Sequence, residues 1–302
     1  MFLNRDRFRI AFRLVQSKSL RLLFGPFERI GIHITAADFY SPIPVVRRIP
    51  EAAWAPFRNM PVPLWDEVVF NGHLNQLQQF YPEYVELLNG DVEGYDPTNQ
   101  SFCPYDAQSY WGMIRSCKPR RIVEIGSGWS TRVGQAAILR NRQENRAPDC
   151  SITVIDPYAH PSLELLPDVT IMRQRLEDTD YPIVEALEAG DFLFIDSSHA
   201  VRFGNDVFYE YLHIIPFLKP GVIVHVHDIF LPHQYPKNWL SDAKYFWAEQ
   251  YLLLAFLMFN NEFEVLLPMH HLWDQQRLDA IFPKHEESPG GFWMRRICPV
   301  GD

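Results

Sequence analysis

The sequence predicts an α/β fold on a doubly wound, mostly parallel, seven-stranded sheet with a C-terminal antiparallel hairpin and an N-terminal helical and loop extension. From about residue 105, short apolar runs alternate with segments of helical periodicity. This alternation is typical of right-handed crossovers in a parallel sheet covered on both faces. The last two apolar runs lack a clear helical segment between them, so one of them should run antiparallel to its neighbour.

The expected elements follow in order along the second part of the chain. Strands are expected at 122–125, 151–155, 169–172, 191–195, 222–226, 263–267 and 292–297. Helices are expected at 107–117, about 130–142, through 183–187, at 203–215 and at 243–260. These elements make residues 105–302 a Rossmann-like domain. Residues 1–104 form the extension, because their frequent prolines and aromatics favour short helices and loops.

The composition limits the class of protein. Hydrophobic residues make up 47% of the 302, which is enough for a packed core, and the net charge of −9 argues against a nucleic-acid partner. Four scattered cysteines without a CxxC pair suit a reducing compartment, and no apolar run reaches the ~18 residues of a membrane span. A cytoplasmic protein is therefore expected; its oligomeric state is open, with a homo-oligomer as one candidate.

The first 30 residues differ from the acidic average of the chain. They mix Arg and Lys with Phe, Leu and Ile at helical spacing, without the cleavage site of a secretory signal. One interpretation is an amphipathic helix that contacts an anionic membrane surface. The other, which we favour, is a first helix that packs on its own domain with its arginines in water.

A glycine turn follows the first expected strand. Gly126, Ser127 and Gly128 lie between that strand and a helix, where a ligand can approach the backbone closely. Asp156 ends the next strand, where a carboxylate can accept both ribose hydroxyls. The pair predicts a nucleoside-containing ligand. A dinucleotide is less favoured, because Thr131 stands where the third glycine of its fingerprint would be.

The ordered motifs VEIGSGWST, VIDPY, FIDSSHA and KPGVIVHVHDIF resemble the class I S-adenosylmethionine-dependent methyltransferases over about residues 105–297. Within that family, they are most similar to the small sugar- and natural-product-type O-methyltransferases. The resemblance implies that the glycine turn passes under the methionine part and ribose of S-adenosylmethionine. It also implies that Asp156 binds the ribose hydroxyls, that Glu124 helps to hold the ammonium end, and that the adenine lies near Arg175.

Polar residues follow the fourth and fifth strands, whose carboxyl ends should be neighbours: Asp196 and His199, then His227 and Asp228. Metal-dependent members of the resembling group place one Asp after the fourth strand and two acids after the fifth. We therefore predict Asp196, His227 and Asp228 as ligands of a divalent cation such as Mg²⁺ or Mn²⁺. His199, with Asp196, is the predicted catalytic base, because Ser198 replaces the acid that the group uses there.

Simpler interpretations of these residues remain open. Asp196 can simply accept hydrogen bonds from turn amides or from the cofactor's ammonium group, and His227 with Asp228 can be a hydrogen-bonded pair without metal. His225 is expected in the core, and His270 in a solvated or lid-facing loop. Residues 230–242, with part of 30–100, are the expected substrate cover.

The sequence thus predicts an enzyme that methylates a hydroxyl on a small molecule or glycan, with metal assistance as a candidate feature. The alternative from another class is a non-catalytic cofactor-binding module with a membrane-peripheral or interaction role. An NAD-dependent oxidoreductase is a third hypothesis, which Thr131 and the terminal hairpin disfavour.

Overall fold

The computed structural model of the chain describes residues 20, 22–37, 40–92, 94–144, 149–179 and 182–298. The chain is divided into two compact units. One unit comprises Met1–Ala55 and Lys237–Phe246, and we call it the terminal unit. The other comprises Pro56–Pro236 and Trp247–Asp302, and we call it the sheet unit. All candidate site residues of the sequence lie in the sheet unit.

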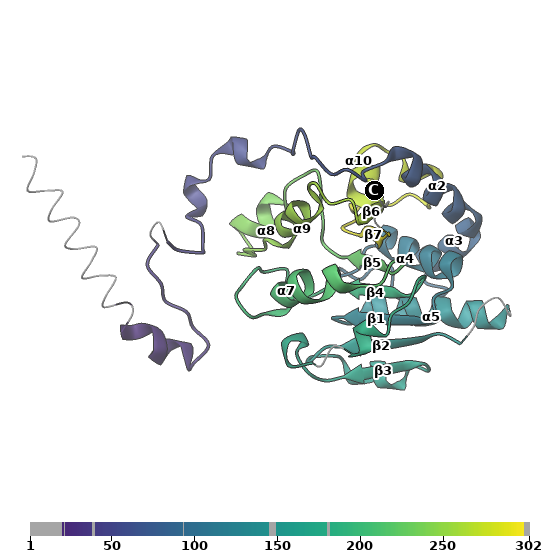
Figure 1. Cartoon of the computed structure of the whole chain (residues 1–302), viewed down its shortest axis with the longest axis horizontal. Helices are drawn as coiled ribbons and strands as arrows, with labels where there is room; N and C mark the ends of the chain where they lie inside the picture. Colours follow the sequence, from purple (N-terminus) through teal and green to yellow (C-terminus); the bar gives the residue numbers. More distant parts are fainter. Residues whose placement is uncertain are drawn as a thin grey trace, which may run out of the picture. The chain divides into compact units, whose positions relative to one another are not determined.

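A seven-stranded sheet with the order β3-β2-β1-β4-β5-β7-β6 forms the centre of the sheet unit (Figure 1). The strands are β1 Arg121–Ile125, β2 Ser151–Ile155, β3 Val169–Met172, β4 Phe192–Ile195, β5 Ile223–Val226, β6 Phe263–Pro268 and β7 Phe292–Arg296. The first five are parallel, and β7 runs antiparallel to both β5 and β6. The predicted fold class is confirmed.

Helices cover both sides of this sheet. Helices α4 (Pro104–Cys117) and α5 (Trp129–Gln143) lie on one side, and α7 (Asp206–Tyr209) and α9 (Glu249–Leu257) lie on the other (Figure 1). Helix α7 continues through a π-helical turn, Glu210–Ile214, into the 3-10 helix Ile215–Phe217. The shorter helices of the unit are α6 Pro182–Glu185, α10 Met269–Asp274, η3 Gln78–Phe80, η4 Pro161–Leu165, η5 Leu176–Asp178 and η8 Leu278–Ala280.

Part of the predicted N-terminal extension packs with the sheet. Helix α2 (Glu67–Leu77) contacts β6, and α3 (Tyr81–Asn89) contacts α4. The predicted boundary between residues 104 and 105 stays a prediction, but these two helices belong to the same compact unit as the sheet.

The terminal unit holds η1 (Val46–Arg48), η2 (Glu51–Trp54) and α8 (Lys237–Ser241), with Lys237 Nζ 2.8 Å from Glu51 Oε2. Residues 22–28 are helical, and Leu22 is 81% exposed there. The rest of the basic segment, residues 1–19 and 21, lies outside the described residues. No helix in the described part of the chain is long and apolar enough to cross a bilayer.

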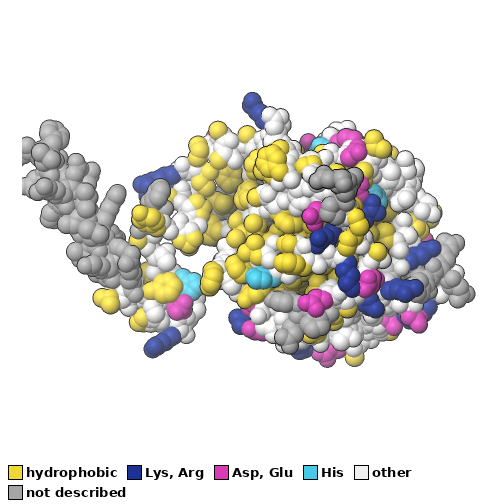
Figure 2. All heavy atoms as spheres, viewed as in Figure 1, with side chains coloured by type: hydrophobic (Ala, Val, Ile, Leu, Met, Phe, Trp, Pro, Cys, Tyr) yellow, Lys and Arg dark blue, Asp and Glu magenta, His cyan; other side chains and the backbone are white. Residues whose placement is uncertain are grey.

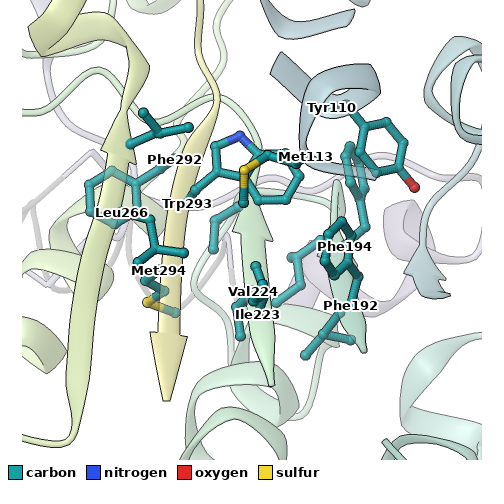
Figure 3. Packing of buried hydrophobic residues seen from close by; sticks show 14 of the residues in the cluster. Tyr110, Met113, Phe192, Phe194, Ile223, Val224, Leu266, Phe292, Trp293 and Met294 are labelled. Atoms are coloured by element: carbon teal, nitrogen blue, oxygen red, sulfur yellow. The ribbon is translucent and has the colours of Figure 1, made fainter. Parts of the chain in front are cut away.

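One hydrophobic cluster extends over both faces of the sheet, and Figure 3 shows the part where α4 packs on the middle strands. The rings of Tyr110 and Phe194 are 4.6 Å apart, and Trp293 on β7 donates from Nε1 to Ser109 Oγ at 3.3 Å. Strands β4 and β5 are buried along their whole length, as strands covered on both faces should be. On the face shown in Figure 2, charged side chains of both signs are interspersed with exposed apolar ones.

Two expectations about the C-terminal part were wrong. The single helix expected at 243–260 is absent: α9 spans only Glu249–Leu257, and the left-handed conformations of Lys244 (φ 64°) and Phe259 (φ 61°) exclude a helix through either position. Strands β6 and β7 pair antiparallel as expected, but α10 and η8 lie in their connection, so His270 is on a helix rather than in a loop.

Candidate active site

The carboxyl ends of four adjacent strands, β2, β1, β4 and β5, lie side by side. Asp196 N donates to Ile125 O at 2.9 Å, and His227 N donates to Ile195 O at 2.9 Å. Gly126 N likewise donates to Ile155 O at 3.1 Å. The pairing of the parallel strands thus continues one residue beyond each end and fixes the glycine turn beside Asp196.

The glycine turn can be built only without a side chain at its first position. Gly126 has φ 89°, and a Cβ atom there would lie 2.0 Å from the carbonyl oxygen of Asp196. Gly128 has φ 149° and is the N-cap of α5. Because these glycines carry no side chains, a ligand can approach the backbone of the turn closely, and the first amides of α5 point toward it.

Asp156 and Ser127 form the nucleoside side of the site. Ser127 Oγ donates to Asp156 Oδ2 at 2.5 Å, and the amide of Tyr158 donates to Oδ1 at 2.7 Å. The carboxylate is half-buried at the end of β2, so it is fixed in direction yet accessible. This arrangement suits a carboxylate that accepts two ribose hydroxyls.

Glu124 is fully buried on β1, one residue before the end of the strand. Its Oε1 accepts from Ser130 Oγ at 2.5 Å, and its Oε2 has no hydrogen-bond partner among the described residues. Burial raises the pKa of this carboxyl from 4.5 to about 8. An unpaired buried carboxyl oxygen below the turn fits the predicted role of Glu124 toward an ammonium group.

His199 lies among three carboxylates. Its Nε2 is 3.3 Å from Asp196 Oδ1 and 3.5 Å from Asp228 Oδ2, and its Nδ1 is 2.8 Å from Glu249 Oε2. His199 and Asp228 have positive φ angles of 55° and 56°, in the left-handed region of backbone conformation that residues other than glycine rarely adopt. Such backbone conformations cost of order 1–3 kcal/mol each and concentrate at functional sites.

The charges of this cluster shift its pKa values. Burial lowers the pKa of His199, but its hydrogen bonds to Asp196 and Glu249 outweigh burial and raise the pKa well above 6.5. Burial raises the pKa of Asp196, yet the charges of His227 and His199 outweigh it and lower the pKa overall. For Asp228 burial prevails, and its pKa is raised.

The two histidines of the fifth strand end differ in their surroundings, because His225 faces the core and His227 also lies near Asp228. His225 stacks on Phe194 at 4.2 Å, and burial lowers its pKa, as expected of a core histidine. His227 is 4% exposed, with its ring 5.3 Å from Phe102 and its Nε2 3.9 Å from Asp228 Oδ1. In the described part of the chain, the carboxylates and histidine whose candidate ligand atoms all lie within 4.8 Å are Asp196, His199 and Asp228, without His227.

Glu249 is the site residue that the sequence did not predict. It is fully buried in the first turn of α9, and Tyr211 Oη donates to its Oε1 at 3.1 Å. The one signal for Glu249 in the sequence was a single acid just before an apolar run, and it lay inside the helix expected at 243–260. Only the contact with His199, fifty residues away, gives it a role.

Comparisons with known proteins found a family match in the middle of the chain. Residues 123–229 match the family model described as a methyltransferase domain. An uncharacterised protein of Archaeoglobus fulgidus is 26% identical over 195 residues, which cover 58% of this chain and 84% of that protein.

Two solved structures are also similar to this chain. One is the S-adenosylhomocysteine-bound methyltransferase PaMTH1 of Podospora anserina, with 17% identity, a TM-score of 0.40, and coverage of 76% of this chain and 88% of that chain. The other is a putative methyltransferase of Thermobifida fusca, with 11% identity, a TM-score of 0.39 and the same coverage. Residues 123–229 are thus similar to a methyltransferase domain, and they contain the glycine turn and Asp156 of the candidate site.

Proposed function

We propose that this methyltransferase transfers the methyl group of S-adenosylmethionine to a hydroxyl of a small molecule or glycan. The observation that carries the proposal is the direct contact between the glycine turn and the strand end that bears Asp196. A Cβ at Gly126 would collide with the carbonyl oxygen of Asp196. The side chain of Asp196 lies near His199, with Oδ1 3.3 Å from Nε2. A cofactor on this turn would therefore end next to groups that can take a proton.

Each residue has a task that its surroundings support. Asp156 and Ser127 hold the ribose, and Glu124 pairs with the ammonium end. When bound, S-adenosylmethionine supplies the methyl group and the leaving group. The Asp196–His199 pair orients the acceptor hydroxyl and receives its proton, because a neutral aliphatic hydroxyl is a poor nucleophile. Alignment of acceptor and methyl group can contribute roughly 7 kcal/mol of the rate enhancement.

Aromatic rings beside His199 favour a ring-shaped acceptor. The Trp247 ring lies 4.4 Å from the His199 ring, and the Tyr235 ring lies 6.1 Å from Trp247. Residues 230–236 of the expected substrate cover belong to the sheet unit and include Tyr235. Apolar ring faces of this kind suit the C–H face of a sugar or a planar acceptor.

Calorimetry followed by an acceptor screen tests the proposal. The protein should bind S-adenosylmethionine and S-adenosylhomocysteine, and it should not bind NAD. Radiolabelled S-adenosylmethionine should then transfer its methyl group to a hydroxyl compound in a panel of sugars, glycans and phenols, and Asp196→Asn should abolish the transfer. Binding of NAD alone would refute the proposal. Cofactor binding without transfer to any member of the panel would favour the non-catalytic module.

A further inference from the structure

The C-terminal strands bring a second group of polar and aromatic side chains to the edge of the sheet that bears the candidate site. In the pairing of β5, β7 and β6, Val226 lies opposite Phe292, and Phe292 lies opposite Pro268. Strand β6 therefore ends at the same edge of the sheet as β5. Helix α10 begins directly after β6, so its side chains can meet those of the loop that follows β5.

One face of α10 carries His270, Trp273 and Asp274, because residues three and four apart share a face of a helix. The rings of His270 and Trp273 are 5.5 Å apart. His233, in the loop after β5, approaches this face: its Nε2 is 3.3 Å from Asp274 Oδ2, and its ring is 5.2 Å from that of His270. We call these four residues the second cluster. The side chains of His233 and Asp274 are 32% and 51% exposed, so a ligand can reach them.

Two short connections join the second cluster to Asp228. The Phe230 ring is 5.1 Å from the His270 ring, and Phe230 follows Asp228 by two residues, which limits the distance between their Cα atoms to about 7 Å. His270 Nδ1 is 3.3 Å from the carbonyl oxygen of Pro289, and a Cβ on the next residue, Gly290, would lie 3.0 Å from the Cα of Asp228. An acceptor longer than one ring can therefore reach from the candidate site to the second cluster.

The loop after β5 and the catalytic histidine are held by neighbouring residues of α9. Gln250 is fully buried; its Oε1 accepts from the amide of Phe230 at 3.0 Å, and its Nε2 donates to the carbonyl oxygen of His233 at 3.4 Å. The preceding residue, Glu249, contacts His199. The second cluster is thus fixed relative to His199 before any ligand binds, which lowers the entropic cost of binding.

The polar atoms of the second cluster favour a ligand that donates hydrogen bonds. Burial lowers the pKa of His270 to about 4, so its ring is neutral near pH 7. Its Nδ1 faces a carbonyl oxygen and carries the proton, which leaves Nε2 as an acceptor. Asp274 adds a carboxylate, which accepts hydrogen bonds and repels anions. The half-buried Trp273 adds an apolar ring face. Several hydroxyl donors next to a C–H face are the features of a sugar.

We propose that His270, Trp273 and Asp274 bind a sugar ring of the acceptor, next to the ring that carries the methylated hydroxyl. The acceptor is then a glycoside of two or more rings rather than a phenol. Trp273 packs on the C–H face of the bound ring, while His270 and Asp274 accept hydrogen bonds from its hydroxyls. This inference rests on the proposed function, because the second cluster lies beside the reacting hydroxyl only if methyl transfer occurs at Asp196 and His199.

Saturation-transfer NMR on the full chain with S-adenosylhomocysteine tests the assignment. The probes are maltose, lactose and cellobiose, with catechol and glucosamine as comparison ligands. At least one disaccharide should receive saturation from the protein. Trp273→Leu and Asp274→Ala should each weaken its binding at least about fivefold, the effect of about one lost hydrogen bond. Asp91→Asn, a change of an exposed aspartate after α3, should leave the binding as in the wild type.

His270→Phe keeps a ring at this position and removes the accepting nitrogen, so it should also weaken disaccharide binding. It is the variant to use should Trp273→Leu fail to fold by circular dichroism. Absence of saturation transfer to all three disaccharides would overturn the proposal, as would disaccharide binding that none of the variants at the second cluster weakens. Binding of catechol or glucosamine alone would overturn it too, because the site would then take a phenol or a cation. Disaccharide binding is measured without methyl transfer, so S-adenosylmethionine binding and the transfer assay decide the proposed function separately.

Discussion

Replacing Glu124 with glutamine should remove a large pH dependence of stability. Burial raises the pKa of Glu124 from 4.5 to about 8 in the folded protein. Between these values the folded chain binds one more proton than the unfolded chain, so the free energy of unfolding falls as the pH rises. One pKa unit corresponds to about 1.4 kcal/mol, which gives a loss of about 3 kcal/mol between about pH 5 and pH 8.

Urea denaturation of both proteins across this range measures the effect. Glu124→Gln keeps the shape of the side chain and an oxygen that can accept from Ser130, but it cannot ionise. The stability of the variant relative to the wild type should therefore rise by about 3 kcal/mol over the range, whatever the other groups contribute. Parallel pH profiles for the two proteins would refute the reasoning, because Glu124 would then be ionised or solvated in the folded state.

The same carboxyl links cofactor binding to pH. Near pH 7 the buried Glu124 is mostly protonated, whereas a partner for an ammonium group must be ionised. Binding of S-adenosylmethionine should therefore release about one proton, seen as a dependence of the binding enthalpy on the buffer. Glu124→Gln should lose this release, and an equal release in both proteins would exclude Glu124 from the ammonium contact.

Three further predictions address the nucleoside site, the core and the N-terminus. Asp156→Ala should weaken S-adenosylmethionine binding tenfold or more in calorimetry, since a charged hydrogen bond contributes roughly 1.5–3 kcal/mol; unchanged affinity would contradict the assignment. Arg115→Met should lower the free energy of unfolding in urea by about 3 kcal/mol, because it leaves Glu83 and Glu144 without the guanidinium that lies 2.8 Å and 2.9 Å from them. If the basic segment binds anionic lipid, deleting residues 1–25 should abolish sedimentation with anionic vesicles at low salt and leave cofactor binding intact; a full-length protein that does not sediment would support the favoured helix packed on its own domain.

The sequence predicted strands better than helices, for identifiable reasons. Strands β2 and β3 have the predicted bounds because their short apolar runs are flanked by polar residues. The helix expected at 243–260 failed because no glycine or proline marks the break near Lys244, whose left-handed conformation is visible only in the structure.

The location of the candidate site could be predicted from the order of the strands, but the exact set of residues in it could not. Adjacent strand ends were enough to bring Asp196, His199 and Asp228 together. Alternation along β5 could have indicated that His227 shares the face of His225, since residues two apart point the same way, and their rings are 5.7 Å apart. The lone acid before an apolar run was too weak a signal to assign Glu249 a role, because that role depends on a contact across fifty residues.

The antiparallel C-terminal strand does more than complete the sheet, because the turn that leads into it shapes the site. Ile229 N donates to Gly290 O at 2.8 Å, and a Cβ on Gly290 would lie 3.0 Å from the Cα of Asp228. The amides of Gly290 and Gly291 donate to the buried carboxylate of Asp106 in the first turn of α4, at 3.0 Å and 2.8 Å. Helix α4 thereby presses the turn against Asp228, which holds its positive φ and aims its carboxylate at His199. The feature that separates this sheet from the dinucleotide-binding type therefore also supports Asp228, which lies beside the proposed Asp196–His199 pair.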